Sequence, residues 1–250
     1  MGLYIEARIR ADLDDLWTRT QDPAQHRRWD LRFTEITLLP SAEGEPQRFR
    51  YATRVLPFLK IAGTGVSAGE RRRPDGTRTS ALRFASPHPL SLLAEGSGYW
   101  RYIPDGDGVR FLTGYDYRPR WGVLGTLADR LLLRPLMGWA TAWSFDRLRL
   151  WLERGITPER ARANWLAELL LRALTAALSL ALFDYGHLLP PAGPLSPLLS
   201  FTTPALSLVA LSLALLAPPL PTTPAARRCL RTPSTHARAP RLLRTLEDHR

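Results

Sequence analysis

The sequence predicts an α+β fold, in which an antiparallel sheet and a long helix are followed by two transmembrane helices. Three observations lead to this prediction. Between Leu3 and Pro119, several stretches alternate apolar and polar side chains, as half-buried strands do. From Val123 to Glu153 the apolar residues instead follow helical spacing. From Tyr185 to Ala226 the chain contains no Asp, Glu, Lys or Arg.

The front of the chain predicts one strand and two short helices. Leu3 to Ile9 alternates apolar and polar residues and therefore predicts a strand. Asp12 stands where an N-cap is needed for the helix predicted in DLDDLWTRT. A second short helix is predicted in DPAQHRRW, because Asp22 can cap it and Pro23 suits its first position.

Six further strands are predicted, separated by turn signals such as SAEGEP, RRPDG and IPDGDG. Gly63, Gly65, Gly96 and Gly98 lie inside these strands and suggest bulges or strong curvature of the sheet. The strands are expected in FTEITLLP, QRFRYATRV, FLKIAGTGVSAGERRR, GTRTSALRFA, SLLAEGSGYWRYI and GVRFLTGYDYRP.

The long helix is predicted in VLGTLADRLLLRPLMGWATAWSFDRLRLWLE. Pro135 lies within it and is expected to kink or break the helix, because proline lacks the backbone N–H. Gly155 follows its last apolar residues and is expected to terminate it.

This order of elements resembles the helix-grip fold of the START-like superfamily, also called SRPBCC. The resemblance rests on YIEARIRADLDDLWTRTQDPAQHRRW at the front and GYDYRPRWGVLGTLADRLLLRPLMGWATAWSFDRLRLWLERG at the back, and it covers residues 1–155. The superfamily includes Bet v 1-like, coenzyme Q-binding and polyketide cyclase/dehydrase members. The resemblance implies a cavity between the sheet and the long helix, and it leaves the activity open because one fold hosts many functions.

Aromatic side chains on the strands and on the long helix are candidates for the lining of that cavity. The functional interpretation is a pocket for an apolar ligand, with tyrosine hydroxyls orienting its polar end. The alternative is ordinary core packing. The ligand-cavity candidates are Phe49, Tyr51, Trp100, Phe111, Tyr115, Tyr117, Trp139 and Trp143.

Catalytic chemistry has one candidate, Asp116, which lies two residues before Arg118 and could act as a base if it were buried. The alternative is a surface ion pair between the two. His26 and His88 are isolated and are expected on a helix surface or in a loop. The acids and glycines at 105–108 fit a hairpin turn better than a calcium loop, and neither a metal site nor a cofactor is expected.

Two apolar segments at about residues 164–183 and 198–217 are predicted to cross a membrane. Leu198 to Ala217 provides twenty uncharged residues, which as a helix match the thickness of a bilayer core. The first segment contains Glu168 and Arg172, which are four residues apart and can pair. For that segment, an amphipathic helix lying on the membrane surface is the alternative.

Arginines flank the two segments on their outer sides, while the connector DYGHLLPPAGPLSP contains no Lys or Arg. The positive-inside rule then predicts a helical hairpin in the inner, cytoplasmic membrane, with both flanks in the cytoplasm. The expected organisation is a ligand-binding domain at 1–155, a transmembrane hairpin at 156–220 and a basic, disordered cytoplasmic tail at 221–250.

The net charge of +11 says little about function. Of the 34 basic residues, 33 are arginine, and they are scattered along the chain. Scattered charge argues against a nucleic-acid partner. Cys229 is the single cysteine, so no intramolecular disulfide can form.

We expect a membrane-tethered START-like domain that binds or carries a hydrophobic small molecule, such as a lipid, quinone or isoprenoid. The alternatives are a polyketide cyclase/dehydratase-like enzyme and a non-catalytic membrane scaffold.

Overall fold

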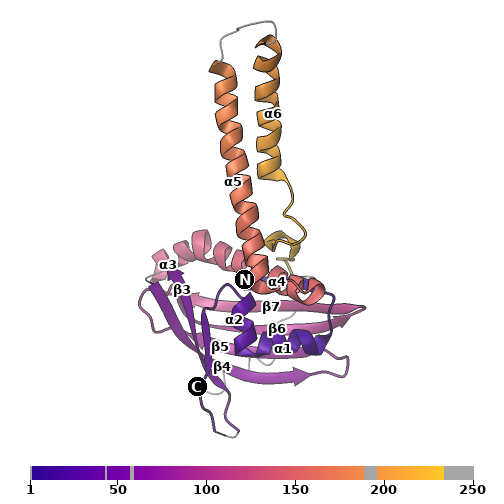
Figure 1. The fold of residues 1–250 in the computed structure, drawn as a ribbon. Helices are drawn as coiled ribbons and strands as arrows, with labels where there is room; N and C mark the ends of the chain where they lie inside the picture. The colour runs from indigo at the N-terminus through magenta and orange to yellow at the C-terminus, as the bar shows by residue number, and fades with distance from the viewer. Residues whose placement is uncertain (1, 43, 57–58, 189–195, 234–250) are drawn as a thin grey trace. The chain divides into compact units, whose positions relative to one another are not determined.

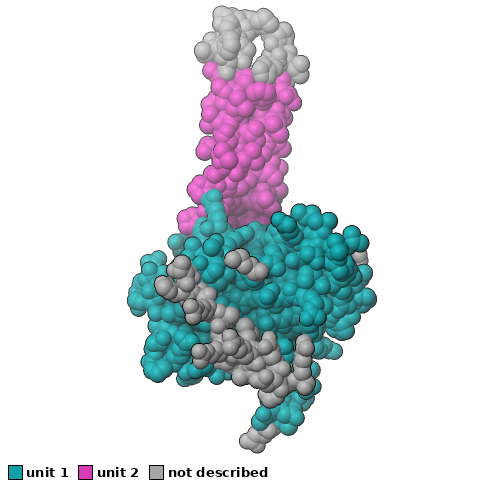
Figure 2. Space-filling model, turned by 180° about the vertical axis from the view of Figure 1, so that it is seen from behind, with its two compact units in different colours: residues 1–159, 225–250 teal, residues 160–224 magenta. Residues whose placement is uncertain are grey.

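The computed structural model describes residues 2–42, 44–56, 59–188 and 196–233 (Figure 1). The chain divides into two units, coloured separately in Figure 2. The first unit comprises residues 1–159 together with 225–250, and the second comprises residues 160–224.

The described part of the first unit contains a seven-stranded antiparallel sheet in the order β1-β7-β6-β5-β4-β3-β2. The α+β prediction and the antiparallel sheet are therefore confirmed. The strands are β1 Leu3–Ile9, β2 Glu35–Leu38, β3 Arg48–Leu56, β4 Leu59–Arg72, β5 Arg78–Ala85, β6 Leu93–Asp105 and β7 Gly108–Pro119.

The strand glycines make room for aromatic rings. Phe49 of β3 is paired with Gly65 of β4, and Tyr51 is paired with Gly63. A Cβ atom at Gly65 would lie 2.1 Å from the Phe49 ring, and one at Gly63 would lie 2.4 Å from the Tyr51 ring. The register of β4 shifts opposite Arg54–Leu56 of β3 and again between Ser67 and Glu70. Neither shift lies at Gly63 or Gly65, so bulges are the wrong one of the two predicted alternatives there, and strong curvature remains the prediction.

Two short helices follow β1 as the caps predict. α1 is Leu13–Gln21, and its N-cap Asp12 accepts hydrogen bonds from the backbone N–H groups of Asp14 and Asp15. α2 is Pro23–Trp29, and its N-cap Asp22 accepts one from Ala24 at 2.8 Å. The carboxylates thus satisfy N–H groups that a helix leaves without intrahelical partners.

The predicted long helix is divided into three parts. After β7, α3 runs from Gly122 to Ala128, the π-helical turn η1 from Asp129 to Leu133, and α4 from Arg134 to Arg154. Pro135 follows the π-helical turn, and the backbone stays in the right-handed helical region through Leu133 and Arg134, so the hydrogen-bond pattern changes before the proline but the helix does not break there. Gly155 ends α4 with a φ of 66°, as predicted.

The segment 225–230 packs on the first unit, although the sequence predicts a disordered tail from residue 221. Leu230 pairs with Glu6 of β1 through two backbone hydrogen bonds of 2.9 Å. The buried carboxylate of Asp146 in α4 accepts hydrogen bonds from the Ala225 N–H at 2.7 Å and from Arg228 at 2.8 Å. The rest of the predicted tail, from residue 234, lies outside the described residues.

The second unit contains most of α5, Pro158–Leu188, and α6, Ser196–Leu216. The stretch Pro158–Asp184 is long and apolar enough to cross a membrane, whereas the apolar stretch described in α6 is Thr202–Leu216. Among the residues whose side chains the structure describes, one helix is therefore long and apolar enough to cross a membrane, where the sequence predicts two. The start of the second predicted segment, residues 198–201, lies outside them.

The charged residues of the first apolar segment pair as predicted. Arg172 donates to Glu168 at 2.6 Å and also to the carbonyl oxygens of Ala214 and Pro218, both at 3.0 Å. The guanidinium thereby supplies partners for carbonyl groups in and after the last turn of α6, which an α-helix leaves unpaired.

Candidate functional site

Helices α2 and α4 pack on one face of the sheet, which we call the inner face, and they cover part of it. The His26 ring of α2 lies 4.8 Å from the Trp100 ring of β6, measured between ring centroids. Phe145 of α4 stacks on Phe111 of β7 at 4.4 Å. Since α4 packs on β1 at one edge and α2 packs near β2 at the other, the sheet curves around the two helices.

The half of the inner face under α2 and α4 is filled with side chains. Trp29 and Phe145 are fully buried and lie 6.1 Å apart, and Trp29 lies 6.2 Å from Trp100. Trp100 and Phe111 are therefore core residues, which is the alternative that the sequence left open. Two open hollows of the described chain lie elsewhere, one along α6 and one beside Arg8 and Glu153.

The other half of the inner face is less covered, and we call it the open half. It is formed by β2 to β5, whose inward-facing aromatic and aliphatic side chains are only half-buried or exposed. Tyr51 contacts Phe33 at 5.7 Å and Phe49 at 6.4 Å, so the rings form a continuous apolar surface. The residues of the open half are Ile36, Leu38, Phe49, Tyr51, Leu82 and Phe84.

Burial raises the pKa of the Tyr51 hydroxyl to about 12. This hydroxyl is therefore protonated at neutral pH and can donate a hydrogen bond. It donates to the carbonyl oxygen of Ala85 at the long distance of 3.5 Å.

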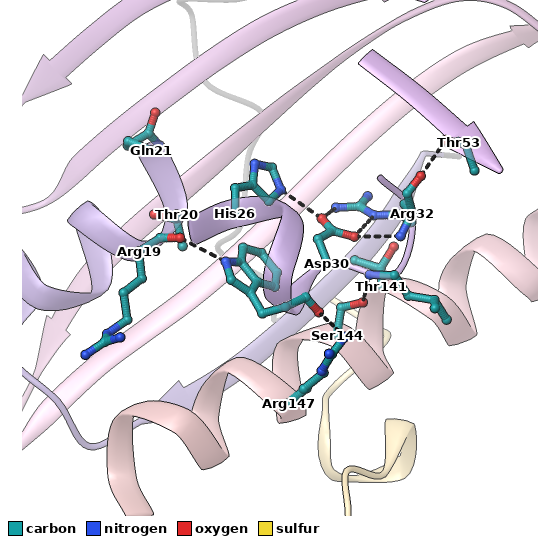
Figure 3. A network of polar contacts seen from close by, with 12 residues as sticks. Arg19, Thr20, Gln21, His26, Asp30, Arg32, Thr53, Thr141, Ser144 and Arg147 are labelled. Atoms are coloured by element: carbon teal, nitrogen blue, oxygen red, sulfur yellow. Dashed lines mark hydrogen bonds and ion pairs between the residues drawn. The ribbon is translucent and has the colours of Figure 1, made fainter. Parts of the chain in front are cut away.

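A buried ionic network lies beside the open half (Figure 3). Arg32 donates two hydrogen bonds to Asp30, at 2.9 Å from Nε and 2.7 Å from Nη2. His26 Nε2 lies 3.0 Å from the same carboxylate, on its other side. The Asp30 side chain is fully buried, and the Arg32 side chain is 10% exposed.

Burial alone would raise the pKa of the Asp30 carboxyl, but Arg32 and the hydrogen bond from His26 outweigh it. They hold that pKa well below its usual range. Asp30 in turn keeps Arg32 charged, with a raised pKa, despite its burial. The network is thus an ionised pair at neutral pH.

The Arg32 guanidinium also lies among aromatic rings, 5.4 Å from the centre of Phe33 and 5.6 Å from that of Tyr115. Cation–π attraction favours this arrangement. Tyr115 in turn shares a hydrogen bond of 3.0 Å with Thr141 of α4. Arg32 therefore stands between the filled half and the open half of the inner face.

Tyr117 belongs to a second buried network. Its hydroxyl donates to Asp129 of η1, and Asp129 also pairs with Arg134 at 3.3 Å. Burial and the hydrogen bond to Asp129 raise the pKa of Tyr117 above its usual value. The hydroxyls of Tyr115 and Tyr117 thus both have protein partners, whereas the sequence suggested that they orient a ligand.

Trp139 and Trp143 stack on each other at 6.3 Å, and Arg147 lies over the Trp143 ring at 5.3 Å. Thr141 and Phe145 of α4 contact Tyr115 and Phe111 of the inner face. A helix period of 3.6 residues explains the difference, because positions 141 and 145 form a different face from positions 139 and 143.

The catalytic candidate Asp116 is exposed and belongs to the outer face of β7. Its carboxylate accepts a hydrogen bond from the backbone N–H of Tyr117 at 3.1 Å. Arg118 is also exposed and pairs with Glu95 at 3.3 Å. Asp116 therefore lacks the burial that would make it a base.

The pairing of Asp30 with Arg32 was not predicted from the sequence, and buried His26 of α2 was predicted on a helix surface or in a loop. Their signal was present in WDLRF, where an acid and a base alternate with large apolar residues. The chain turns here, with the Phe33 N–H donating to the Asp30 carbonyl oxygen at 3.3 Å, and the two charged side chains can meet.

No known family model matches this chain. It is similar to the uncharacterized membrane protein YndG of Bacillus subtilis (strain 168), with 52% identity over 159 residues. That match covers 63% of this chain and 59% of the relative, so the chain spans about three fifths of the curated relative.

Solved structures with a similar backbone include a STAR-related lipid transfer protein from Xanthomonas axonopodis, with 21% identity and a TM-score of 0.43. The match covers 60% of this chain and 84% of that one. Another is the Zhui aromatase/cyclase from Streptomyces sp. R1128, with 15% identity and a TM-score of 0.40 over 59% and 95% of the two chains. At these sequence identities, a similar backbone does not show that this chain shares the activity of either protein.

Proposed function

We propose that the chain is a membrane-tethered START-like domain that binds a hydrophobic small molecule, such as a lipid, quinone or isoprenoid, on the open half of the inner face. The observation that carries this proposal is the contrast within one face of the sheet. Trp29 and Phe145 fill one half completely, while Phe49 and Tyr51 remain half-buried in the other. Apolar surface that a fold leaves uncovered next to its core is where an apolar ligand gains most from leaving water.

The surroundings of the open half suit a ligand with one polar end. The Tyr51 hydroxyl can donate a hydrogen bond to a carbonyl or hydroxyl oxygen. The Arg32–Asp30 pair is internally neutralised, so the site favours a neutral polar group over a free anion or cation. A quinone, an isoprenoid alcohol or a neutral lipid satisfies both requirements.

The membrane tether is supported by α5 and by the similarity to a protein named as a membrane protein. A ligand that dissolves in the bilayer would then reach the domain without a long passage through water. The function of the relative is not established by its name, so the ligand class rests on the chemistry of the open half.

The two ends of the second unit support a hairpin in the membrane. Arg147 Nε donates to the carbonyl oxygen of Pro158 at 2.7 Å, just before the second unit begins. The neighbouring Asp146 accepts from Ala225, where the chain returns to the first unit. A folded domain with a polar surface stays on one side of a bilayer, so a chain that leaves and returns there crosses an even number of times. The arginines on both flanks favour the cytoplasmic side of the inner membrane.

Ligand binding is tested by native mass spectrometry on the full chain and on a variant in which residues 160–224 are replaced by a flexible linker. The variant keeps residues 225–230, because they pack on β1 and α4. We expect an apolar molecule to remain bound at near one-to-one ratio in both proteins. Absence of bound molecules, together with no uptake of added quinone, isoprenoid alcohol or neutral lipid, would refute the proposal.

The open half is tested by Phe49→Ala and Tyr51→Ala. Each change removes apolar contact area and is expected to weaken ligand affinity about tenfold, as the loss of one to two kcal/mol of apolar burial does. Arg50→Ala is the matched control, because Arg50 lies on the same strand and is exposed on the other face. Affinity is measured by fluorescence titration with the identified ligand, and equal affinities for all four proteins would place the site elsewhere.

The hairpin is tested with single cysteines at Arg160 and Thr222, in a Cys229→Ser background. We expect a membrane-impermeant thiol reagent to label both positions from the cytoplasmic side of inverted vesicles and neither from the outer side of intact spheroplasts. Opposite accessibility of the two positions would mean an odd number of crossings.

A further inference from the structure

The segment from Trp121 to Leu136 exposes an unusual number of large apolar side chains, and we call them the α3 apolar surface. Val123 is 86% exposed, Leu124 is 76% exposed and Leu131 is 70% exposed. Leu127, Leu132 and Leu136 are more than half exposed as well. Exposed apolar patches of this kind on a folded domain mark interaction sites.

In α3 and η1, the usual amphipathic pattern of a helix is reversed. Gly125 and Asp129 are four residues apart and form the buried side. A Cβ atom at Gly125 would lie 1.5 Å from the carbonyl oxygen of Arg120, which excludes a larger residue there. The buried side thus carries a glycine and an acid, while the leucines point outward. Water does not favour this orientation, so a partner for the outward side is needed.

The orientation is fixed by specific contacts. Asp129 is held by the Tyr117 hydroxyl and by Arg134, so η1 cannot rotate its acid outward without breaking both contacts. At the other end, Arg120 donates to the carbonyl oxygens of Ser86 at 2.6 Å and His88 at 3.3 Å. The segment is therefore a built feature of the domain.

The charges around the surface indicate the class of partner. Asp129, the acid between Trp121 and Leu136, is buried and paired. Arg130 is exposed, and Arg120 at the border donates to carbonyl oxygens and keeps its charge, whereas the charge of Arg134 is offset by Asp129. Apolar side chains with a basic rim and a half-exposed tryptophan are the combination that binds the interfacial layer of an anionic bilayer.

The chain also brings this surface near a bilayer. α4 begins directly after η1 and ends at Arg154, and three residues separate it from α5. A 21-residue helix is about 32 Å long, so the surface stays within a few nanometres of the anchor at any angle between the units. At the resulting high local concentration, even weak insertion is favourable.

We propose that the α3 apolar surface inserts into the interfacial layer of the same membrane that holds α5. This inference rests on the membrane tether of the proposed function and is independent of the ligand. Its consequence is that the first unit docks on the bilayer through a second, non-covalent contact, instead of swinging freely on its anchor.

The test uses the full chain with Cys229→Ser and Leu124→Cys, labelled with an environment-sensitive fluorophore and reconstituted in phosphatidylcholine/phosphatidylglycerol vesicles. The control label is at Asp107→Cys, an exposed hairpin position whose side chain is 66% accessible. We expect a blue-shifted emission and about twofold quenching by shallow spin-labelled lipids at position 124, and neither at position 107, because interfacial helices lie about 5–10 Å deep.

Three outcomes would overturn the inference. The label at position 124 could remain as water-exposed as that at 107, or quenching at 124 could persist unchanged after Leu127→Glu and Leu131→Glu. Alternatively, position 124 could be shielded without lipid quenching and cross-link to a second copy, which would make the surface a dimer interface. Release of the protein from vesicles by alkaline carbonate would instead refute the membrane tether of the proposed function. Ligand affinity is measured in a separate experiment, so failure of ligand binding does not affect this test.

Discussion

Asp30→Asn is expected to lower the free energy of unfolding by about 3–5 kcal/mol, because it leaves the buried Arg32 cation without its counter-ion. The amide can accept one hydrogen bond from Arg32 but cannot supply the charge. His26 loses its carboxylate partner in the same change. The measurement is chemical unfolding of the full chain in mild detergent, followed by tryptophan fluorescence, since Trp29 and Trp100 lie next to the network.

The matched control is the double variant Asp30→Asn with Arg32→Met, which removes both charges. We expect it to recover most of the lost stability, because a buried ion pair replaced by apolar groups is often neutral for folding. A single variant that costs less than about 1 kcal/mol would mean that water reaches Arg32, as at a surface pair.

The same pair gives a pH dependence with a defined sign. Burial would raise the pKa of Asp30, but Arg32 and His26 lower it below the ordinary value. A carboxyl with a lowered folded-state pKa stabilises the fold above its unfolded pKa of about 4, and this stability is lost as the pH falls toward the folded value. The difference in stability between wild type and Asp30→Asn should therefore be largest near neutral pH and shrink below pH 4. A difference that stays constant down to pH 2 would contradict this origin.

Asp146→Ala is expected to raise the rate at which Cys229 reacts with a thiol reagent by at least about a hundredfold near pH 8, because the residue becomes an accessible thiol. In the structure Cys229 is buried and donates to the carbonyl oxygen of Ala142 at 3.3 Å. Burial raises the pKa of its thiol to about 12, so little thiolate is present. Asp146 holds the segment through Ala225 and Arg228, and without it the segment is expected to detach.

Cys229 is the single cysteine, so the reaction reports on this segment alone. Glu153→Ala is the matched control, because Glu153 is another acid of α4 and pairs with Arg149, outside the segment 225–230. We expect wild type and Glu153→Ala to react equally slowly. Fast reaction of the wild-type thiol would show that the segment is already open, and slow reaction of Asp146→Ala would show that β1 holds it unaided.

The sequence by itself determined the local elements of the first unit. Asp12 and Asp22 cap α1 and α2 because a carboxylate at that position binds free N–H groups, whatever the tertiary structure. The strands followed from alternation, and Gly155 ends α4 because glycine adopts the left-handed conformation of a helix terminator without strain. Apolar length alone likewise identified α5 as a helix that can cross a membrane.

Only the tertiary structure decided what the local pattern does not encode. In the structure, Phe145 stacks on Phe111 in the filled half of the inner face, and Thr141 contacts Tyr115. The sequence had instead suggested Trp139 and Trp143 for the helix face toward the sheet. The tertiary structure also joined Asp30 to His26 and Asp146 to a segment almost eighty residues later in the chain. Spacing along one helix or strand predicts which residues share a face, but which face is buried depends on elements distant in sequence. For the same reason, the exposure of the α3 leucines could be recognised only once the buried side of that helix was known.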